Sequence, residues 1–318
     1  MKILSTGSAV PKQSVTNDMM AQVMDTSDEW IYTRTGIRSR FVAGEDENSL
    51  TLAVDASKLA ISRAGIALED IGIVICATIT GDYRTPSLAC LIQRELGLSE
   101  SVLAFDLNAA CSGFIYALAV AQPMLQDGKY ALILGSEHLT RVIDFSDRST
   151  CVLFGDGAGA VIAAKSDTAF SFVSGARGES EALAIGAAPS SESPFGKKNK
   201  TPLTWLKMDG QAVFRFAVEV MVKSIRDVIE KAGKRVEDIS HFVCHQANKR
   251  IIDNAVQRLG VPSERFFMNI ETHGNTSAAS VPLALDELND TGRLKRGDDV
   301  VFAGFGGGLT YGAVYMQW

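Results

Sequence analysis

The sequence predicts an α/β fold built from two copies of one unit, and internal repetition is the main observation behind that prediction. Three segments of the first half, Ala64-Gly65, Glu69-Asp70-Ile71 and Val74-Ile75-Cys76, return 168 positions later as Ala232-Gly233, Glu237-Asp238-Ile239 and Phe242-Val243-Cys244. A second match, at a spacing of 169, pairs residues 128–135 with residues 297–304. Within each copy, amphipathic helical segments alternate with apolar strands, which predicts helix layers packed on mixed sheets.

The elements follow the same order in both copies. A strand begins at once at residues 1–7, and in each copy an amphipathic helix ends at a C-cap glycine, Gly65 or Gly233. Buried strands are expected at 71–78 and 239–245, because these runs are continuous, apolar and rich in β-branched residues. The remaining strands are expected at 103–107, 131–135 and 152–164 in the first copy and at 266–270, 300–303 and 310–317 in the second.

The repeat divides the chain into an N-terminal half, residues 1–170, and a C-terminal half, residues 171–318, which are expected to share an interface. The first carries the candidate nucleophile and the second the candidate hydrogen-bond donors. Residues 175–202 are rich in Gly, Ala, Ser and Lys and show no clear period. We expect them to form a long surface insertion where the halves meet.

Composition excludes several classes of function. Apolar residues make up 46% of the chain and charged residues 21%, as in ordinary globular proteins, and the net charge of −6 argues against nucleic acid as a partner. No apolar run is long enough for a membrane span, and the N-terminus lacks the features of a signal peptide. The five cysteines match no metal-site spacing, so we expect a cytoplasmic protein without a metal centre.

Cys111 is the candidate nucleophile. It follows an apolar strand and opens an apolar helix expected at 112–126, and the N–H groups and dipole of a helix N-terminus favour a thiolate by lowering the thiol pKa. The alternative is a buried structural cysteine. The other four cysteines, Cys76, Cys90, Cys151 and Cys244, lie inside apolar runs and fit that alternative.

His245 and Asn275 are the candidate partners of this thiol. His245 ends a buried strand, where α/β folds commonly place functional side chains, although a hydrogen-bonded core histidine is the alternative for it and for the other histidines. Asn275 follows Gly274 in a turn, and its alternative is a turn or capping asparagine. A weak third repeat match places this turn where Cys111 falls in the first copy.

Two glycine-rich runs are interpreted differently. The run 304–308 follows a strand but lacks the residues of a phosphate loop, so we expect its N–H groups to approach a substrate oxygen as an oxyanion hole. The run 155–159 is expected to allow tight packing at a turn.

Together these contexts resemble the β-ketoacyl-acyl-carrier-protein synthase III family of the thiolase-like superfamily, over essentially the whole chain. The resemblance rests on the motifs at 25–31, 33–38, 154–160, 245–248, 274–280 and 305–308. It implies a five-layered αβαβα fold in a homodimer. It also implies decarboxylative Claisen condensation of an acyl-CoA primer with malonyl-acyl-carrier protein, giving 3-ketoacyl-carrier protein, CoA and CO₂ and initiating type II fatty acid synthesis.

In this resemblance Cys111 is acylated, and the backbone N–H groups of Cys111 and Gly307 hold the oxyanion. His245 and Asn275 donate hydrogen bonds to the malonyl thioester carbonyl, and no metal or redox cofactor is needed. Two neutral donors suit an enolate, whereas a Cys–His pair with a carboxylate partner would suggest acyl hydrolysis or base catalysis.

The resemblance also assigns binding residues. Trp30 and Arg34 would contact the CoA adenine and Arg148 the nucleotide phosphates, although Ser149 departs from the glycine that many relatives carry. Gly210, Phe214, Ala247 and Asn248 would line the pantetheine channel. Arg215, Lys249, Arg250 and Arg258 would dock the acidic carrier protein, the alternative being a solvated helix face. Thr85 would cap the acyl pocket across the dimer and leave room for longer or branched primers.

Two other functions remain open from the sequence. A synthase III relative in a polyketide or other secondary pathway would use the same residues on another acceptor. A non-catalytic partner subunit of the same fold would typically lose the nucleophile, so the presence of Cys111 with His245, Asn275 and Gly307 argues against it.

Overall fold

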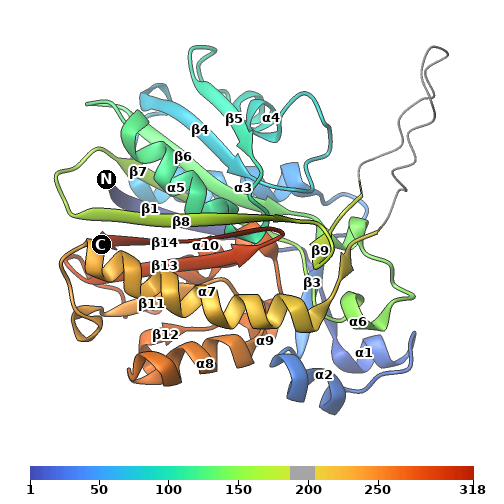
Figure 1. Ribbon diagram of the computed structural model, residues 1–318. Helices are drawn as coiled ribbons and strands as arrows, with labels where there is room; N and C mark the ends of the chain where they lie inside the picture. Colours follow the sequence, from blue (N-terminus) through green and yellow to red (C-terminus); the bar gives the residue numbers. More distant parts are fainter. Residues whose placement is uncertain (187–204) are drawn as a thin grey trace, which may run out of the picture.

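Two five-stranded sheets lie on either side of a central helix layer in the computed structural model, which describes residues 1–186 and 205–318 (Figure 1). The strands of the first sheet are, in spatial order, β1 (Lys2–Ala9), β7 (Gly157–Ala164), β6 (Tyr130–Glu137), β4 (Ile71–Ala77) and β5 (Leu103–Leu107). Those of the second are β8 (Phe170–Glu179), β14 (Gly308–Gln317), β13 (Asp299–Gly306), β11 (His241–Cys244) and β12 (Phe266–Phe267).

The two sheets have the same topology. In the orders given, the first three strands of each sheet pair antiparallel and the last three pair parallel. Each strand therefore has a counterpart, and β8, the counterpart of β1, begins at Phe170. This correspondence confirms the duplication predicted from the sequence.

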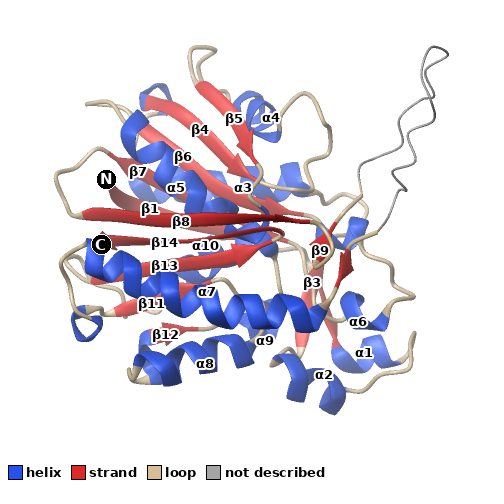
Figure 2. Cartoon of the chain, viewed as in Figure 1, coloured by secondary structure: helices blue, strands red, loops and turns tan. Residues whose placement is uncertain are grey.

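Helices form three layers around the sheets, which confirms the five-layered αβαβα architecture (Figure 2). The central layer consists of α5 (Gly113–Met124) and α10 (Ser280–Asp290), whose apolar side chains pack with those of both sheets. The outer face of the first sheet is covered by α3 (Ser49–Ala64) and α4 (Leu88–Glu95), and that of the second by α7 (Gly210–Lys231) and α8 (Lys249–Leu259). Within the described ranges, no helix is both long and apolar enough to cross a membrane.

Smaller elements pack beside these layers and complete one end of the molecule (Figure 1). They are α1 (Asn17–Ala21), α2 (Asp28–Thr35), α6 (Arg148–Cys151), α9 (Ile270–His273), the antiparallel pair β2 (Gln13–Thr16) and β3 (Ser39–Val42), and the antiparallel pair β9 (Leu183–Ala184) and β10 (Lys207–Met208). Their apolar side chains share a separate cluster that includes Ile31, Leu139 and Ile270. This cluster supports the region through which the cavity described below opens.

Three expected segments differ from the structure. The strand expected at 152–164 begins only at Gly157, because residues 152–156 form the connection from α6, in which Phe154 bridges to Asn275. The strand expected at 266–270 ends at Phe267, because α9 already begins at Ile270. The insertion expected at 175–202 is wrong at its start, since Gly175 lies inside β8 opposite Tyr311. A Cβ built on Gly175 would lie 2.3 Å from that ring, so the glycine serves strand packing. Residues 187–202 of the expected insertion lie outside the described residues.

Candidate active site

Cys111 lies in a 3₁₀ turn, Ala110–Ser112, between β5 and α5, which agrees with the predicted strand-to-helix turn. The end of β13 packs directly on this turn, since a Cβ built on Gly306 would lie 2.5 Å from Cys111 N and 3.1 Å from Cys111 Cβ. From β14, Thr310 Oγ1 lies 2.6 Å from Ser112 Oγ. The glycine-rich run therefore packs against the backbone that carries the candidate nucleophile.

A matching turn leads into α10 in the second half. Ala110 and Ser277 both have positive φ, +46° and +48°, and each begins a 3₁₀ turn that precedes a helix of the central layer. The relation expected between the turns of Cys111 and Asn275 is therefore present. Counted from the positive-φ residues, however, Cys111 corresponds to Ala278, three positions beyond Asn275.

The Cys111 thiol is buried, and this burial changes its ionisation. Burial raises the pKa of the Cys111 thiol to about 12, against a smaller lowering from the Ser277 hydroxyl and a further increase from Glu137. The expectation that the helix N-terminus holds this pKa low is therefore wrong for the resting protein. Desolvation is the largest cause of this raised pKa, because the surrounding protein buries the thiol.

His245 follows β11 and is 1% exposed. Its backbone N–H donates to Ala303 O at 2.8 Å, its ring packs edge-on against Phe305, and its Nδ1 lies 2.7 Å from Ser280 Oγ. Burial lowers the pKa of His245 to about 3, so the ring is neutral at physiological pH. A neutral ring with one N–H is the state expected of a hydrogen-bond donor.

Asn275 is held by its backbone and by one side of its amide. Its N–H donates to Leu153 O at 2.8 Å, and its carbonyl accepts from Gly155 N at 3.0 Å. Its side-chain Oδ1 accepts from Ser277 N at 2.9 Å, whereas its amide nitrogen makes no hydrogen bond to residues 1–186 or 205–318. The turn interpretation and the donor interpretation are therefore compatible, because the oxygen shapes the turn while the NH₂ group can face a substrate.

One cavity of about 980 Å³ brings the three candidate side chains together. Besides these three polar side chains, the lining contains an apolar wall that includes Ile79, Phe154, Leu183 and Phe305. Predicted residues that line it are Cys111, His245, Asn275, Gly307, Trp30, Arg34, Gly210, Phe214, Arg215, Ala247, Asn248 and Arg250. Arg148, Lys249, Arg258 and Thr85 do not line it.

Comparisons with known proteins agree with this geometry. Models of 3-oxoacyl-[acyl-carrier-protein] synthase III match residues 105–178, and models of its C-terminal part match residues 229–318. A β-ketoacyl-[acyl-carrier-protein] synthase III from Clostridium perfringens is 44% identical over 324 aligned residues, covering 99% of this chain and 98% of the relative. The chain belongs to the β-ketoacyl-[acyl-carrier-protein] synthase III family. It is thus an acyltransferase of the condensing type.

Solved structures of related enzymes show that the similarity of this synthase III to its relatives includes the fold. A β-ketoacyl-[acyl-carrier-protein] synthase III from Thermus thermophilus superposes with a TM-score of 0.92 at 45% identity, covering 100% of this chain and 99% of the other. The priming β-ketosynthase of the R1128 polyketide pathway superposes with a TM-score of 0.91 at 40% identity, covering 99% and 95%. Fold alone therefore does not separate the two kinds of pathway.

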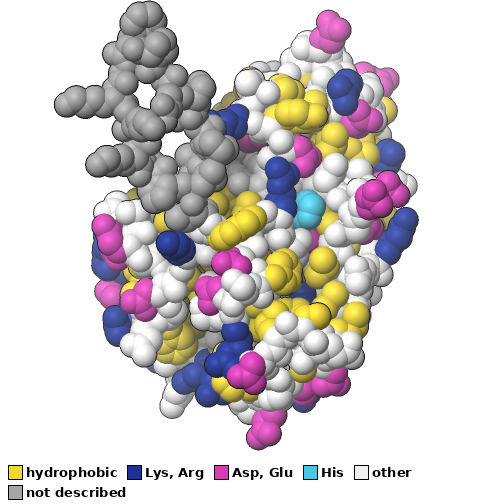
Figure 3. Space-filling view, turned by 90° about the vertical axis from the view of Figure 1, so that its right-hand side faces the viewer, with side chains coloured by type: hydrophobic (Ala, Val, Ile, Leu, Met, Phe, Trp, Pro, Cys, Tyr) yellow, Lys and Arg dark blue, Asp and Glu magenta, His cyan; other side chains and the backbone are white. Residues whose placement is uncertain are grey.

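The mouth of the synthase III cavity carries an aromatic side chain between two cations. The guanidinium carbons of Arg34 and Arg148 lie 4.6 and 4.8 Å from the Trp30 ring centroid. Asn248 ties this region to α8, because its Oδ1 caps the helix while its Nδ2 donates to Arg34 O at 3.0 Å. On the face shown in Figure 3, apolar side chains gather between groups of basic and acidic ones.

The four cations expected to dock a carrier protein fall into two pairs. Arg215 and Arg250 line the cavity, and Arg250 lies 5.5 Å from the Phe214 ring centroid. Lys249 Nζ pairs with Asp253 at 2.7 Å along α8, and Arg258 donates to Val218 O of α7 at 3.2 Å, so the first is held on its own helix and the second against the neighbouring one. Two of the four therefore point to the cavity mouth.

Glu137 is a buried group near the candidate nucleophile, and sequence patterns did not single it out. It is 0% exposed at the end of β6, and its Oε2 accepts from Ile79 N at 3.2 Å and from the Thr80 hydroxyl. Burial raises the pKa of Glu137 to about 7, partly offset by these donors. Its position beside Ser277 and Cys111 depends on contact between the two halves of the chain. In the sequence, the signal is that two polar residues, Ser136 and Glu137, end an apolar strand.

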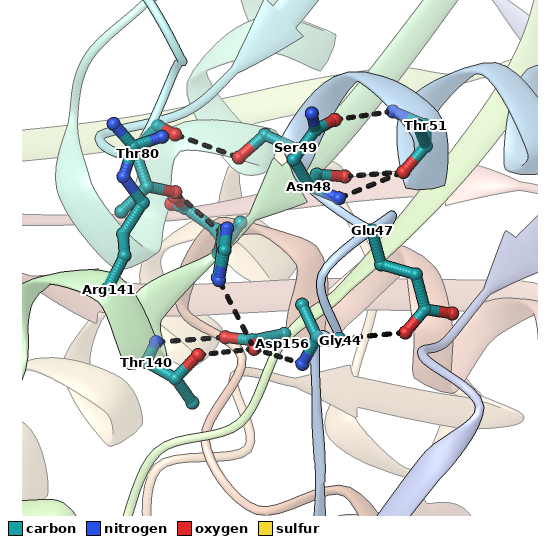
Figure 4. Close-up of polar contacts among 12 residues, drawn as sticks. Gly44, Glu47, Asn48, Ser49, Thr51, Thr80, Thr140, Arg141 and Asp156 are labelled. Atoms are coloured by element: carbon teal, nitrogen blue, oxygen red, sulfur yellow. Dashed lines mark hydrogen bonds and ion pairs between the residues drawn. The ribbon is translucent and has the colours of Figure 1, made fainter.

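A polar network around Asp156 supports the same loops (Figure 4). Thr140 donates to Asp156 through its N–H at 2.9 Å and its hydroxyl at 2.6 Å, and Ser49 Oγ donates to Thr80 O at 2.8 Å. A Cβ built on neighbouring Gly155 would lie 2.5 Å from His273 O. Tight packing of the run 155–159 is therefore confirmed, but the expected turn is wrong for residues 157–159, which lie in strand β7.

Proposed function

We propose that this enzyme condenses an acyl-CoA primer with malonyl-acyl-carrier protein to form 3-ketoacyl-carrier protein, CoA and CO₂, the step that initiates type II fatty acid synthesis. The observation that carries the proposal is the meeting of one thiol, Cys111, with two neutral donors, His245 and Asn275, in a single apolar cavity. A thiol holds the acyl group, and two donors stabilise an enolate.

In the first stage the Cys111 sulfur attacks the thioester carbon of acyl-CoA. The backbone N–H groups of Cys111 and Gly307 stabilise the oxyanion, a role supported by the close approach of the glycine run to this turn. The C–S bond to CoA then breaks, and the thiol proton leaves with CoA sulfur. Because the proton passes from one sulfur to the other, no permanently ionised thiolate is required, in keeping with the high thiol pKa.

In the second stage malonyl-carrier protein occupies the cavity. His245 and the amide nitrogen of Asn275 donate to its thioester carbonyl, and the carboxylate leaves as CO₂. The resulting enolate carbon attacks the carbonyl carbon of the acyl group on Cys111. The bond from that carbon to the Cys111 sulfur then breaks, 3-ketoacyl-carrier protein is released, and the sulfur regains a proton from solvent. The low pKa of His245 supports a donor that stays neutral rather than a charged acid. No metal or redox step enters this sequence of bond changes.

Substrate binding is proposed for the cavity mouth. Trp30, with Arg34 and Arg148, stacks the CoA adenine and meets the nucleotide phosphates. Gly210, Phe214, Ala247 and Asn248 line the pantetheine path. Arg215 and Arg250, supported by Lys249 and Arg258, dock the acidic carrier protein, and the enzyme works in the cytoplasm.

A homodimer is proposed through the edge of the first sheet. In the described chain β5 pairs only with β4, and Leu103 on it is 49% exposed. A second copy paired along this edge would cover it and bring Thr85, which lies on an exposed loop near Tyr83, toward the partner's acyl pocket. Light scattering of wild type and Leu103→Asp tests this, since a wild-type monomer would contradict it.

The polyketide alternative is not favoured, because full-length relatives of 42–45% identity are β-ketoacyl-[acyl-carrier-protein] synthase III enzymes. Identity to solved structures does not decide between them, since the priming β-ketosynthase, at 40%, lies between synthase III structures at 45% and 39%. The decisive experiment is incubation with labelled acyl-CoA followed by peptide mapping. An acyl group on Cys111, discharged on addition of malonyl-carrier protein, is the expected result, and its absence would refute the proposed function. Competition among acetyl-, branched and medium-chain acyl-CoA then defines the primer.

A further inference from the structure

His245 has a buried hydroxyl neighbour that has no role in the scheme above. Ser280 is the first residue of α10 and, like His245, is 1% exposed. Its Oγ lies 2.7 Å from His245 Nδ1, and it also lies 3.4 Å from the backbone nitrogen of Gln246. The two side chains come from different elements, the end of β11 and the start of the central helix layer.

The direction of the hydrogen bond between Ser280 and His245 follows from which of the neighbouring atoms can donate and which can accept. The Gln246 N–H can only donate, so it takes a lone pair of Ser280 Oγ, and the hydroxyl hydrogen still needs an acceptor. Among the described residues, His245 Nδ1 is the only acceptor recorded within hydrogen-bond distance of that hydroxyl. The hydroxyl therefore donates, and Nδ1 accepts with its lone pair.

The ring then has one place left for its single proton. His245 is neutral, with a pKa of about 3, so it carries either Nδ1–H or Nε2–H. A ring that accepts at Nδ1 carries its proton at Nε2, the nitrogen for which the described residues supply no partner. In the other tautomer, Nε2 would turn a lone pair toward the substrate carbonyl oxygen and repel it.

We propose that Ser280 is a positioning residue that fixes the Nε2–H tautomer of His245 by donating to Nδ1, and thereby makes this histidine a donor to the thioester carbonyl rather than a base. The inference rests on the proposed role of His245 in the condensation. It assigns Ser280 a function in carbon–carbon bond formation and none in acylation of Cys111.

The tautomer can be observed directly in the wild-type enzyme. The chain has four histidines, so ¹⁵N-histidine labelling gives a small set of ring signals, and a His245→Asn variant identifies those of His245 by their loss. Long-range nitrogen–proton correlations then show which ring nitrogen is protonated. A proton on Nε2 is the expected result, and a proton on Nδ1 would overturn the inference whatever the activity of the enzyme.

The kinetics of Ser280 variants test whether Ser280 contributes to condensation but not to acylation of Cys111. Ser280→Ala should lower kcat for condensation about tenfold, the factor that a neutral buried hydrogen bond is worth, while the rate of Cys111 acylation by acyl-CoA is unchanged. Ser280→Thr, which keeps the hydroxyl, should restore most of kcat. The matched control is Ser57→Ala in α3, another buried serine, whose hydroxyl donates to Ala53 O at 2.6 Å.

The outcomes separate this inference from the proposed function. Equal loss of acylation and condensation in Ser280→Ala would indicate a structural role, and wild-type condensation would remove any role, so both overturn the inference. If Ser280→Ala does not fold, the tautomer of the wild-type ring and the kcat of Ser280→Thr still decide it. Wild-type condensation in His245→Ala would instead refute the donor role of His245, with the tautomer still readable.

Discussion

Gly306→Ala should disable acylation of Cys111 while leaving the protein folded. Gly306 has an ordinary φ, so an alanine fits its backbone, but the new Cβ would lie 2.5 Å from Cys111 N and 3.1 Å from Cys111 Cβ. Ordinary van der Waals contact begins at 3.4 Å, so the Cys111 turn has to move by roughly 0.9 Å. A displacement of about 1 Å at a reacting centre lowers the rate on the order of a hundredfold.

The assay is single-turnover transfer of a labelled acyl group from acyl-CoA to Cys111, combined with thermal unfolding. Overpacking of this kind destabilises a fold by about 1–3 kcal/mol, so the variant should remain folded at assay temperature. Gly72→Ala is the matched control, because it lies in strand β4 and its new Cβ would meet only the flexible Lys129 side chain, at 3.4 Å. Wild-type acylation by folded Gly306→Ala would refute the reasoning.

Three further predictions concern the site. Cys111→Ala should abolish acyl transfer but retain malonyl decarboxylation, whereas His245→Ala and Asn275→Ala should each lower condensation by about 10²–10³-fold and spare acylation, measured by acyl-enzyme mass and CO₂ release. Equal loss of both activities in all three folded variants would contradict that division. Because burial raises the folded-state pKa of Glu137 from 4.5 to about 7, the unfolded chain loses this proton first, and stability should fall as pH rises from 4.5 to 7. Glu137→Gln should flatten that decline in chemical denaturation, and an unchanged slope would count against it. Trp30→Ala should raise KM for acyl-CoA by the equivalent of roughly 1–3 kcal/mol with kcat retained, and an unchanged KM would remove Trp30 from the adenine site.

The sequence was sufficient to predict the fold class and to predict that the side chains of Cys111, His245 and Asn275 meet in one cavity. Duplication is visible in sequence because both halves bury the same strands and end helices at the same glycines, and these signals are local. Cys111 and His245 stand at the ends of such strands, so their convergence at one edge followed from topology. The strand expected at 266–270 was wrong at its end, because β12 stops at Phe267 and helix α9 begins at Ile270, although the composition of the run still favours a strand.

Only the tertiary structure decided the ionisation and the partners of these groups. The thiol pKa of Cys111 was expected to be low from its helix position, yet it is high, because desolvation depends on how the two halves close over the sulfur. The contact of Ser280 with His245 joins residues 35 positions apart, and Glu137 reaches Ser277 from the other half. Sequence periodicity records which face of an element is buried, whereas burial depth and hydrogen-bond direction arise from elements that meet only in the folded chain.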